Sequence, residues 1–454
     1  MTNDRPPESI VLASRSDRGF EAPTVKLSSW ISVIRPLAAF YLVAVASLAW
    51  GVAAGRYEVF PFCVIQTIHA GIVDLMHDPR SFVGSLTRPR QIRRNPFSYN
   101  GLQRRDEAFR DSGYLLVSRF SQTHSQVILE LIRLGDGRIL HTWIPPLDEI
   151  LRRGKTESFE NSREGYRAQH PLLLPDGSLV FSSGEGPLVR IDKRNGLLWL
   201  IPGNFHHSIE RDHNGNLVVP VVNEPSMCAY PWMRDDGFAV VSPNGEVLKR
   251  HSVGAILMRS GHAGLYLGVD KVSYDRIHLN DAQPIGRDSG VARTGDVALS
   301  CRTLSTVFLY RPSTDEVVWL KTGPWLCQHD VNLVEGNTYS VFGNDVFSRT
   351  GKTCDELFGV SSQVYLFDPS TQQVHTPYAE VLESLKVRTA FSGRSRILPN
   401  GDAFVEESDA SRLLRVSPTA VRWEYVGGES AEWIGSLHWC RYLGPDEIDL
   451  SWME

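Results

Sequence analysis

From about residue 112 onward, apolar and polar residues alternate in short runs broken by turns, a pattern typical of half-buried β-strands. The turns carry Gly, Asn-Gly or Pro-x-x-Asp, which favour tight connections between antiparallel strands. One unit, HPLLLPDGSLVFSSGEGPLVRIDKRNGLLWLI at residues 170–201, holds four such strands, and six comparable units can be counted. A single small sheet cannot bury both faces, so neighbouring units are expected to pack radially. The pattern therefore predicts an all-β fold, a six-bladed β-propeller over residues 111–454.

A different pattern lies near the N-terminus, where residues 36–55 contain no charged side chain. As a helix rising about 1.5 Å per residue, this run would span about 30 Å, the thickness of a bilayer core. The preceding residues include four arginines and one lysine, which favours a cytoplasmic N-terminus. A cleaved signal peptide is the alternative, because GVAAG offers small residues. We expect a cytoplasmic segment at 1–35, one transmembrane helix at 36–55 and a connector at 56–110.

Composition narrows the class of partner. Charged residues make up 22% of the chain and the formal net charge is −5, which gives no reason to expect a nucleic-acid partner. The six cysteines contain no CxxC pair and no spacing typical of a metal site. Their pairing is left open by the sequence.

One position of the repeat carries chemically active side chains in five of the six units. It lies seven or eight residues before the glycine of the first turn, with a longer insertion in the fourth unit. The residues there are His170, His207, His278, His329 and Arg394. The first strands of a propeller line its central channel, so these side chains should converge at one mouth. A lone histidine more often lies on the surface or in the core, but packing does not explain this recurrence.

Three further residues are candidates beside this position. His206 precedes His207, and the length of the following turn favours His207 as the one that faces the channel, which the sequence alone leaves open. Asn280 would share a face with His278 on an extended strand. Arg302, in SCRTLS, is either a surface residue of a hairpin or a rigid set of donors suited to a tetrahedral oxyanion.

Several histidines with arginines and few carboxylates favour an anion site. Zinc is the first rival, since three histidines could bind it, but these residues lack a local ligand spacing and the arginines oppose a cation. We therefore expect no metal. Transfer of a phosphoryl or sulfuryl group through a histidine fits best, because a neutral imidazole can attack while cationic donors balance the oxygen charge.

Four segments, FHHSIERDHNGN, IHLNDA, GDVALSCRTLSTV and GPWLCQHDVNLVEGN, resemble core segments of the bacterial aryl-sulfate sulfotransferases. SRILPNGDAFVEES resembles that family's last blade, and the likeness covers about residues 112–430. The resemblance implies a six-bladed propeller in the periplasm. It also implies transfer of a sulfuryl group from an aryl sulfate to a phenolic acceptor, through a sulfated histidine and without a cofactor or a nucleotide sulfate donor (PAPS).

Carried over by this resemblance, His329 in QHD matches the histidine that becomes sulfated. His207, His278 and Arg302 match the residues that bind the sulfate and phenolic oxygens, and Asn280 matches an accessory donor. The catalytic candidates are thus His329, His207, His278 and Arg302. The substrate-binding candidates are Asn280, His206, His170 and Arg394.

The chain also departs from the family. Secreted members carry an extra N-terminal β-domain, whereas this chain has an apolar segment and a short basic connector. The apolar segment and the basic residues before it, together with the resemblance, predict a single-pass protein of the bacterial inner membrane with its catalytic domain in the periplasm. The donor, the acceptor and a homodimer stay open. One alternative is a non-catalytic membrane-anchored propeller that serves as a ligand-binding or assembly scaffold, and another is a metal-dependent hydrolase or lyase in the same channel.

Overall fold

The chain divides into two compact units, residues 1–67 and 68–454, in a computed structural model. The structure describes residues 40–51, 91–154, 162–228, 233–268, 274–346, 348–349, 352–353, 361–428 and 430–453. The predicted cytoplasmic segment 1–35 and residues 56–90 of the predicted connector lie outside this part of the chain.

The described part of the first unit is a helix at residues 40–51. Among the described residues, no helix is long and apolar enough to cross a membrane. This finding corrects the predicted transmembrane helix at 36–55, and with it the single-pass inner-membrane localisation.

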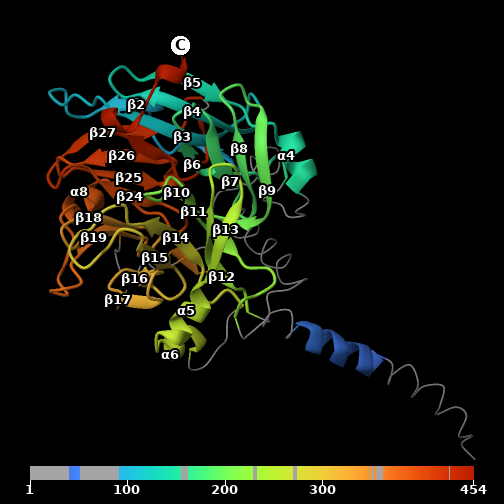
Figure 1. Ribbon diagram of the computed structural model, residues 1–454. Coiled ribbons are helices and arrows are strands. Elements are labelled where there is room, and N and C mark those ends of the chain that lie inside the picture. Colours follow the sequence, from blue (N-terminus) through green and yellow to red (C-terminus); the bar gives the residue numbers. More distant parts are fainter. Residues whose placement is uncertain are drawn as a thin grey trace, which may run out of the picture. The chain divides into compact units, whose positions relative to one another are not determined.

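The described part of the second unit consists mainly of antiparallel sheets (Figure 1). One sheet has the order β29 (Arg441–Leu443), β3 (Tyr114–Ser121), β4 (Gln126–Arg133), β5 (Arg138–Trp143). Another runs β14 (Leu279–Pro284), β15 (Val297–Cys301), β16 (Thr306–Arg311), β17 (Glu316–Thr322). A third runs β18 (Val331–Glu335), β19 (Thr338–Gly343), β22 (Gln363–Phe367), β23 (Val374–His375). The fourth runs β24 (Arg394–Ile397), β25 (Ala403–Glu407), β26 (Arg412–Val416), β27 (Val421–Val426), β2 (Gly101–Arg104).

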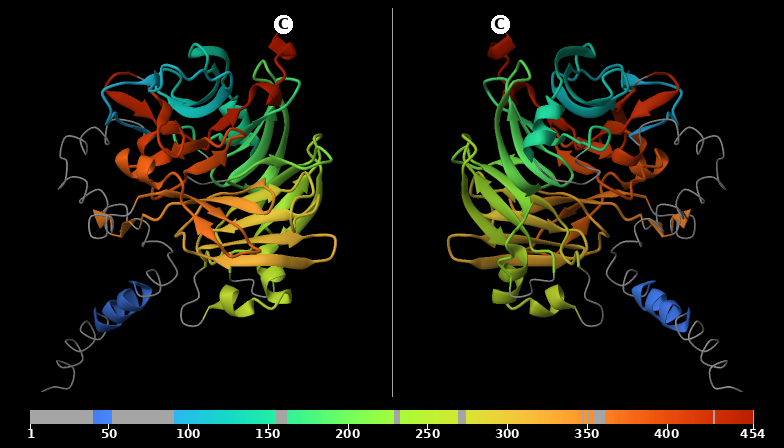
Figure 2. Two further views of the ribbon diagram at one scale, coloured as in Figure 1. Left: turned by 90° about the vertical axis from the view of Figure 1, so that its left-hand side faces the viewer. Right: turned by 90° about the vertical axis from the view of Figure 1, so that its right-hand side faces the viewer.

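The remaining strands form one large sheet and two small ones. The large sheet holds β6 (Gln169–Leu173), β7 (Leu179–Ser182), β8 (Gly186–Ile191), β9 (Leu197–Phe205), β10 (Glu210–Arg211), β11 (Leu217–Val222), β12 (Asp236–Val241) and β13 (Val247–Ser252). The small sheets pair β1 (Ile92–Arg94) with β28 (Trp433–Gly435) and β20 (Ser348–Arg349) with β21 (Lys352–Thr353). Short helices are α4 (Leu147–Gly154), α5 (Val253–Arg259), α6 (Ala263–Leu267) and α8 (Ala379–Ser384), of which α5 and α6 project beyond the sheets in Figure 2.

The hydrogen bonding corrects the predicted number of blades. Four sheets of four or five strands stand as separate blades among the described residues. The strands predicted as the second and third units instead form one eight-stranded sheet, because Asn204 and Phe205 at the end of β9 pair with Val222 and Val221 of β11. The prediction of six separate blades is therefore wrong, and the arrangement is propeller-like with four. Local alternation predicts strands but not pairing between successive units.

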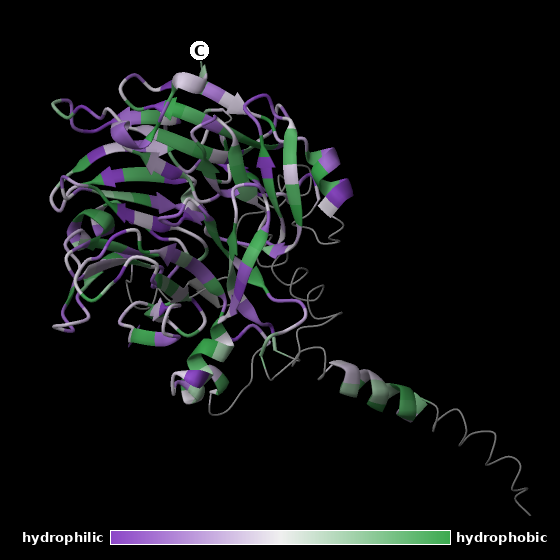
Figure 3. Ribbon diagram, viewed as in Figure 1, coloured by the Kyte–Doolittle hydropathy of each residue, from purple (hydrophilic) through white to green (hydrophobic). Residues whose placement is uncertain are grey.

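Hydrophobic clusters lie between neighbouring sheets. Val307 and Leu309 of β16, for example, pack in one cluster with Val341 of β19 in the next sheet. Figure 3 shows hydrophobic residues running along the strands, while many loops at the edge are hydrophilic. Burial of both faces of a strand explains why β4, QVILELIR, is buried over almost its whole length.

Segments from the two ends of the second unit pair with each other. β29, near the C-terminus, pairs with β3, and β2 pairs with β27 of the last blade. Figure 1 shows β2 beside β27, although they are far apart in the sequence. This closure brings the loop before β29 to the centre of the unit, next to the loops before the other first strands.

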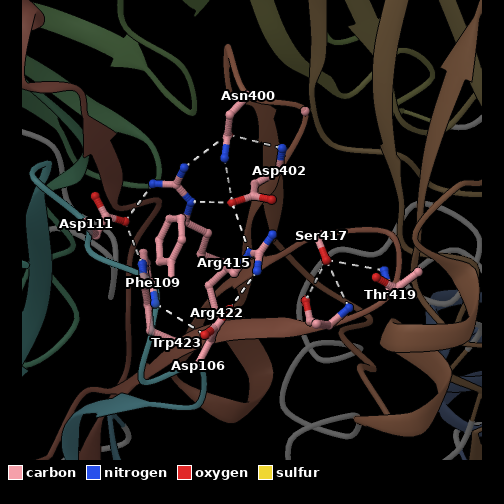
Figure 4. A network of polar contacts seen from close by, with 12 residues as sticks. Asp106, Phe109, Asp111, Asn400, Asp402, Arg415, Ser417, Thr419, Arg422 and Trp423 are labelled. Atoms are coloured by element: carbon pink, nitrogen blue, oxygen red, sulfur yellow. Dashed lines mark hydrogen bonds and ion pairs between the residues drawn. The ribbon is translucent and has the colours of Figure 1, made fainter.

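A buried polar network fixes this closure (Figure 4). The Arg415 guanidinium donates to Asp402 Oδ2 at 2.9 Å and to Asp111 Oδ2 at 2.7 Å, and Trp423 Nε1 also donates to Asp111, at 2.7 Å. The guanidinium carbon of Arg415 lies 4.7 Å from the ring centre of Phe109. Asp111 and Phe109 precede β3, whereas Asp402 and Arg415 belong to the last blade, so the network joins sequence-distant segments.

Candidate active site

A cavity of about 730 Å³ collects residues from the loops that precede the first strands of the sheets and from loops that follow their second strands. Its lining includes His207, His278, Arg302 and His329. These are the four residues that the sequence nominated as catalytic, and each comes from a different loop. Side chains separated by up to 122 positions in the sequence are thus brought to one place.

The backbone at the nominated position is itself unusual. His207 and His278 have φ angles of 57° and 50°, and His170 has a φ of 44°. Residues other than glycine adopt this left-handed region infrequently and at some cost in free energy. At three of the five nominated positions the histidine therefore coincides with a sharp bend, which lies before a strand at His207 and His278 and within β6 at His170. Strain of this kind concentrates at functional sites.

The rings of the site lie close together around Trp439. The ring centre of His207 is 5.5 Å from that of His278 and 6.3 Å from that of His329. Trp439, only 1% exposed, lies 5.7 Å from His207 and 6.0 Å from His329. A molecule in the cavity could therefore contact several imidazoles at once.

The hydrogen bonds of His329 define its tautomer. Nδ1 lies 2.6 Å from Asn344 Oδ1, and the amide nitrogen of Asn344 donates to the carbonyls of Thr389 and Ser392 at 2.8 Å each. Because this leaves Asn344 Oδ1 as the acceptor, Nδ1 of His329 is assigned the proton. Nε2 then carries the lone pair, and it accepts a hydrogen bond from the Ser392 amide at 2.9 Å.

Two histidines of the site, His329 and His207, favour the neutral form. Burial, with the nearby Arg302 guanidinium, lowers the pKa of His329 to about 3, although its hydrogen bond to Asn344 acts in the opposite direction. Burial and the neighbouring histidines hold the pKa of His207 well below its ordinary value. A neutral histidine beside a cationic arginine combines a nucleophile with an oxyanion donor.

His278 is held differently, by an acid. Its Nδ1 lies 2.5 Å from the Asp275 carboxylate, and its side chain is 29% exposed. A carboxylate at one ring nitrogen holds the imidazole in one orientation and one tautomer. The other nitrogen of His278 is thereby suited to exchange a proton with a bound molecule.

The four substrate-binding candidates lie outside the lining of this cavity. His206 sits behind His207, with its Nδ1 2.9 Å from Nδ1 of that residue, and Asn280 donates to the Gln328 carbonyl at 3.1 Å. His170 and Arg394 contact each other through Nε2 and Nη1. Their roles in substrate binding stay predictions.

His438 is a lining residue that the sequence did not nominate. It precedes β29, and its Nε2 donates to Gln91 Oε1 at 2.6 Å. The repeat pattern begins at residue 112 and did not indicate His438. In the sheet that holds β3, β4 and β5, the first strand is β29, which comes from near the C-terminus. Arg93, Arg167 and Phe391 also line the cavity and carry no repeat signal.

The described residues include side chains of metal-binding types and four cysteines. Among them, no group of three or more His, Cys, Asp or Glu side chains is placed to hold a metal ion. Four cysteines in the same part of the chain are free: Cys228, Cys301, Cys327 and Cys440. The other two, Cys63 and Cys354, lie outside it.

Carboxylates beside the nominated residues tie one first strand to the next. Asp330, next to His329, accepts from the Ser395 amide at 2.6 Å, and Asp281 accepts from the Val331 amide at 3.0 Å. Burial, together with nearby carboxylates, raises the pKa of Asp281 to about 8. Asp281 is therefore mostly protonated at neutral pH.

Replacing Asp281 by asparagine should change how stability depends on pH. A carboxyl whose pKa is raised by folding keeps its proton while the unfolded chain has lost it, so its stabilising contribution falls as pH rises from ~4 to about 8. The stability of Asp281→Asn relative to wild type should then increase over that range, by up to about 1.4 kcal/mol per pH unit. Urea unfolding at several pH values measures this, with Asp446→Asn at an exposed position as control. A difference that is constant with pH would contradict it.

Comparisons with known proteins bear on the fold and the family. A protein of unknown function from Bacteroides caccae is 13% identical with a TM-score of 0.46, covering 73% of this chain and 99% of its own. Virginiamycin B lyase from Staphylococcus aureus is 10% identical with a TM-score of 0.37, covering 73% and 90%. A functionally unknown protein from Desulfotomaculum acetoxidans is 9% identical with a TM-score of 0.40, covering 73% and 100%. These low TM-scores carry no conclusion about function.

No curated protein matches the chain. The family model of the arylsulfotransferases (ASST) matches residues 170–428, more than half of the chain. The matched residues include His207, His278, Arg302 and His329, which line the cavity. They also include most strands of the second unit. This match supports a sulfotransferase-like enzyme, and the chain belongs to the arylsulfotransferase family.

Proposed function

We propose that the protein moves a sulfuryl group from an aryl sulfate to a phenolic or similar acceptor, without PAPS, through a sulfohistidine at His329. The observation that carries the proposal is the convergence of His207, His278, Arg302 and a neutral His329 in one cavity. The site residues offer a nucleophile, donors for sulfate oxygens and a proton-transfer group in van der Waals reach of one small molecule.

In the first step, Nε2 of His329 attacks sulfur, the N–S bond forms and the bond between sulfur and the aryl oxygen breaks. Arg302 and His207 donate hydrogen bonds to the sulfate oxygens, where negative charge is concentrated. His278, oriented by Asp275, gives its proton to the departing phenolate. In the second step the acceptor phenol returns a proton to His278, attacks sulfur and releases free His329.

One contact must change before this attack. The lone pair of His329 Nε2 is occupied by the Ser392 amide. The adjacent Phe391 is 60% exposed, and its ring centre lies 5.8 Å from the Arg302 guanidinium carbon. Segment 391–392 thus contacts both the nucleophile and the oxyanion donor. We expect a bound aryl sulfate to displace it and free Nε2.

The direct test is incubation of the full chain with 4-nitrophenyl sulfate, with and without an added phenol. The expected result is a burst of nitrophenol, a gain of one SO₃ group in intact mass, and sustained release once phenol is present. Treatment with EDTA should leave the burst intact. Absence of release and of adduct with several aryl sulfates would overturn the proposal in favour of a binding scaffold, and loss of the burst with EDTA would favour metal-dependent chemistry.

The pH dependence of the first step should reflect the unusual histidine. Because the pKa of His329 is lowered to about 3, its free base persists as pH falls from 7 to 5. An ordinary histidine would lose about twentyfold of its free base over this range. Single-turnover nitrophenol release should therefore not decline in this window. A drop of that size, centred near pH 6.5, would mean that the attacking group titrates normally.

A further inference from the structure

A second cavity, of about 1040 Å³, lies along the first strands themselves. Its lining includes residues of β10, β14, β18, β24 and β29, whereas the active-site cavity is lined mainly by loops that precede these strands or follow the second strands. Trp439 lies between residues of the two sets. Its ring is 5.7 Å from His207, and 6.0 Å from the guanidinium carbon of Arg394, which lines the second cavity.

The lining of the second cavity carries a surplus of positive charge. Its charged residues are Arg211, Arg287, Arg394, Arg396, Arg441, Glu210, Glu335 and Glu447. Arg441 pairs with Glu210 at 3.1 Å, and Arg396 pairs with Glu447. The lining residues outside these two pairs are Arg211, Arg287, Arg394 and Glu335. The lining therefore carries a net excess of about two positive charges.

Arg394 is the member whose surroundings point to a ligand. It is 6% exposed, and within the described part of the chain it makes no ion pair. Its Nη1 contacts His170 Nε2, and among the described residues its Nε has no hydrogen-bond partner. Burial, together with Arg394 and Arg441, holds the pKa of His170 well below its ordinary value. A buried donor without an acceptor is unfavourable, because it has lost its hydrogen bonds to water.

The buried acids near Arg394 accept hydrogen bonds from backbone amides. Asp330 accepts from the amides of Phe342 and Ser395 at 2.8 and 2.6 Å. Glu406 accepts from the amide of Trp439 at 3.0 Å and from that of Cys440 at 2.5 Å. Both carboxylates act on Arg394 through space, yet neither forms an ion pair with it. The guanidinium is left with donor capacity for an anion in the cavity.

We propose that the second cavity binds a small dianionic oxyanion of the sulfate or phosphate type, with Arg394 as the buried contact and Arg287 at the rim. Two negative charges match the surplus, and the planar fork of a guanidinium suits tetrahedral oxyanions. This site is separate from the sulfuryl-transfer site and does not depend on its chemistry. The ion reaches it either free or as the charged group of a monoester.

Calorimetric titration of the full chain with sodium sulfate and sodium phosphate tests the proposal. The titration is run at constant ionic strength in an Arg302→Gln background, so that anion binding in the active-site cavity is weakened. Arg394→Gln should raise the Kd at least about tenfold and Arg287→Gln about threefold or more, because each removes a charged donor. Arg194→Gln, an exposed arginine outside both cavities, should stay within about twofold.

Two further titrations test whether the ligand is a free ion or a monoester, and whether it carries two charges. Tighter binding of phenyl phosphate than of inorganic phosphate would support a monoester, and the reverse would support the free ion. Acetate that binds as tightly as sulfate would overturn the dianion assignment. The site itself would be overturned by equal affinities in Arg394→Gln, Arg287→Gln and Arg194→Gln. Should Arg394→Gln fail to fold, Arg287→Gln at the exposed rim decides alone, since the side chain of Arg287 makes no ion pair with another described residue.

Discussion

His329→Ala should abolish both nitrophenol release and the covalent adduct, with a loss of at least about 10³-fold in the first step. The variant removes the atom that would bond to sulfur. The fold should survive, because His329 makes its side-chain hydrogen bonds to loop residues rather than to a strand ladder. Intact mass and stopped-flow release under single-turnover conditions measure the two effects.

Matched variants separate a nucleophile from a merely buried histidine. His213→Ala changes an exposed histidine in a turn and should leave both readouts as in wild type. Asn344→Ala should retain some adduct while slowing the first step by about 10- to 100-fold, because it removes the acceptor that fixes the tautomer of His329. An adduct that persists in His329→Ala would move the nucleophile to another residue, and His207 would then be the first to test.

Arg415→Met should produce the largest loss of stability, about 3–5 kcal/mol. The side chain of Arg415 is 8% exposed, and those of its partners Asp111 and Asp402 are 4% and 3% exposed. Methionine keeps much of the volume but removes the cation that pairs with Asp111, and it leaves Asp402 with the 3.5 Å contact to Arg422 Nε. Because these partners come from both ends of the second unit, we expect the loss in the global unfolding transition, measured by urea titration.

Two controls accompany this variant. Arg153→Met breaks the Arg153–Glu149 pair on α4, whose side chains are 44% and 42% exposed, and should change stability by about 0.5 kcal/mol or less. Adding Asp402→Asn to Arg415→Met should recover part of the loss, since one buried charge is then removed. Equal losses in Arg415→Met and Arg153→Met would mean that the network in Figure 4 contributes little to closure.

The sequence predicted the active-site candidates from one shared position of the repeat, and the tertiary structure determines which of them line the cavity. His207, His278 and His329 share one position of the repeat, and all three line the cavity. His170 occupies the same position and shares the left-handed φ of His207 and His278, yet its ring contacts Arg394 and Arg441. Sequence position alone could not separate these outcomes, since each depends on which neighbouring strand supplies the partner.

The repeat pattern did not predict the site residues that come from other segments of the chain. His438 reaches the cavity because β29 pairs with β3 across more than three hundred positions of sequence. Asn344 and Ser392, which set the tautomer and the access of His329, lie after one strand and before another. No alternation of hydrophobic residues encodes such contacts, because periodicity reports the burial of a strand and not its partner.

By itself, the sequence determined that the body is built of short antiparallel strands, that a recurring histidine precedes several of them, and that its motifs resemble the arylsulfotransferases. These properties are local, since alternation, turn residues and motifs act over a few neighbouring positions. The tertiary structure decided that β9 joins β11, which gives four separate blades and one eight-stranded sheet. Among the described residues it shows no helix long and apolar enough to cross a membrane. It also decided which histidines meet and which buried arginine makes no ion pair with another described residue, because pairing and burial depend on residues distant in the chain.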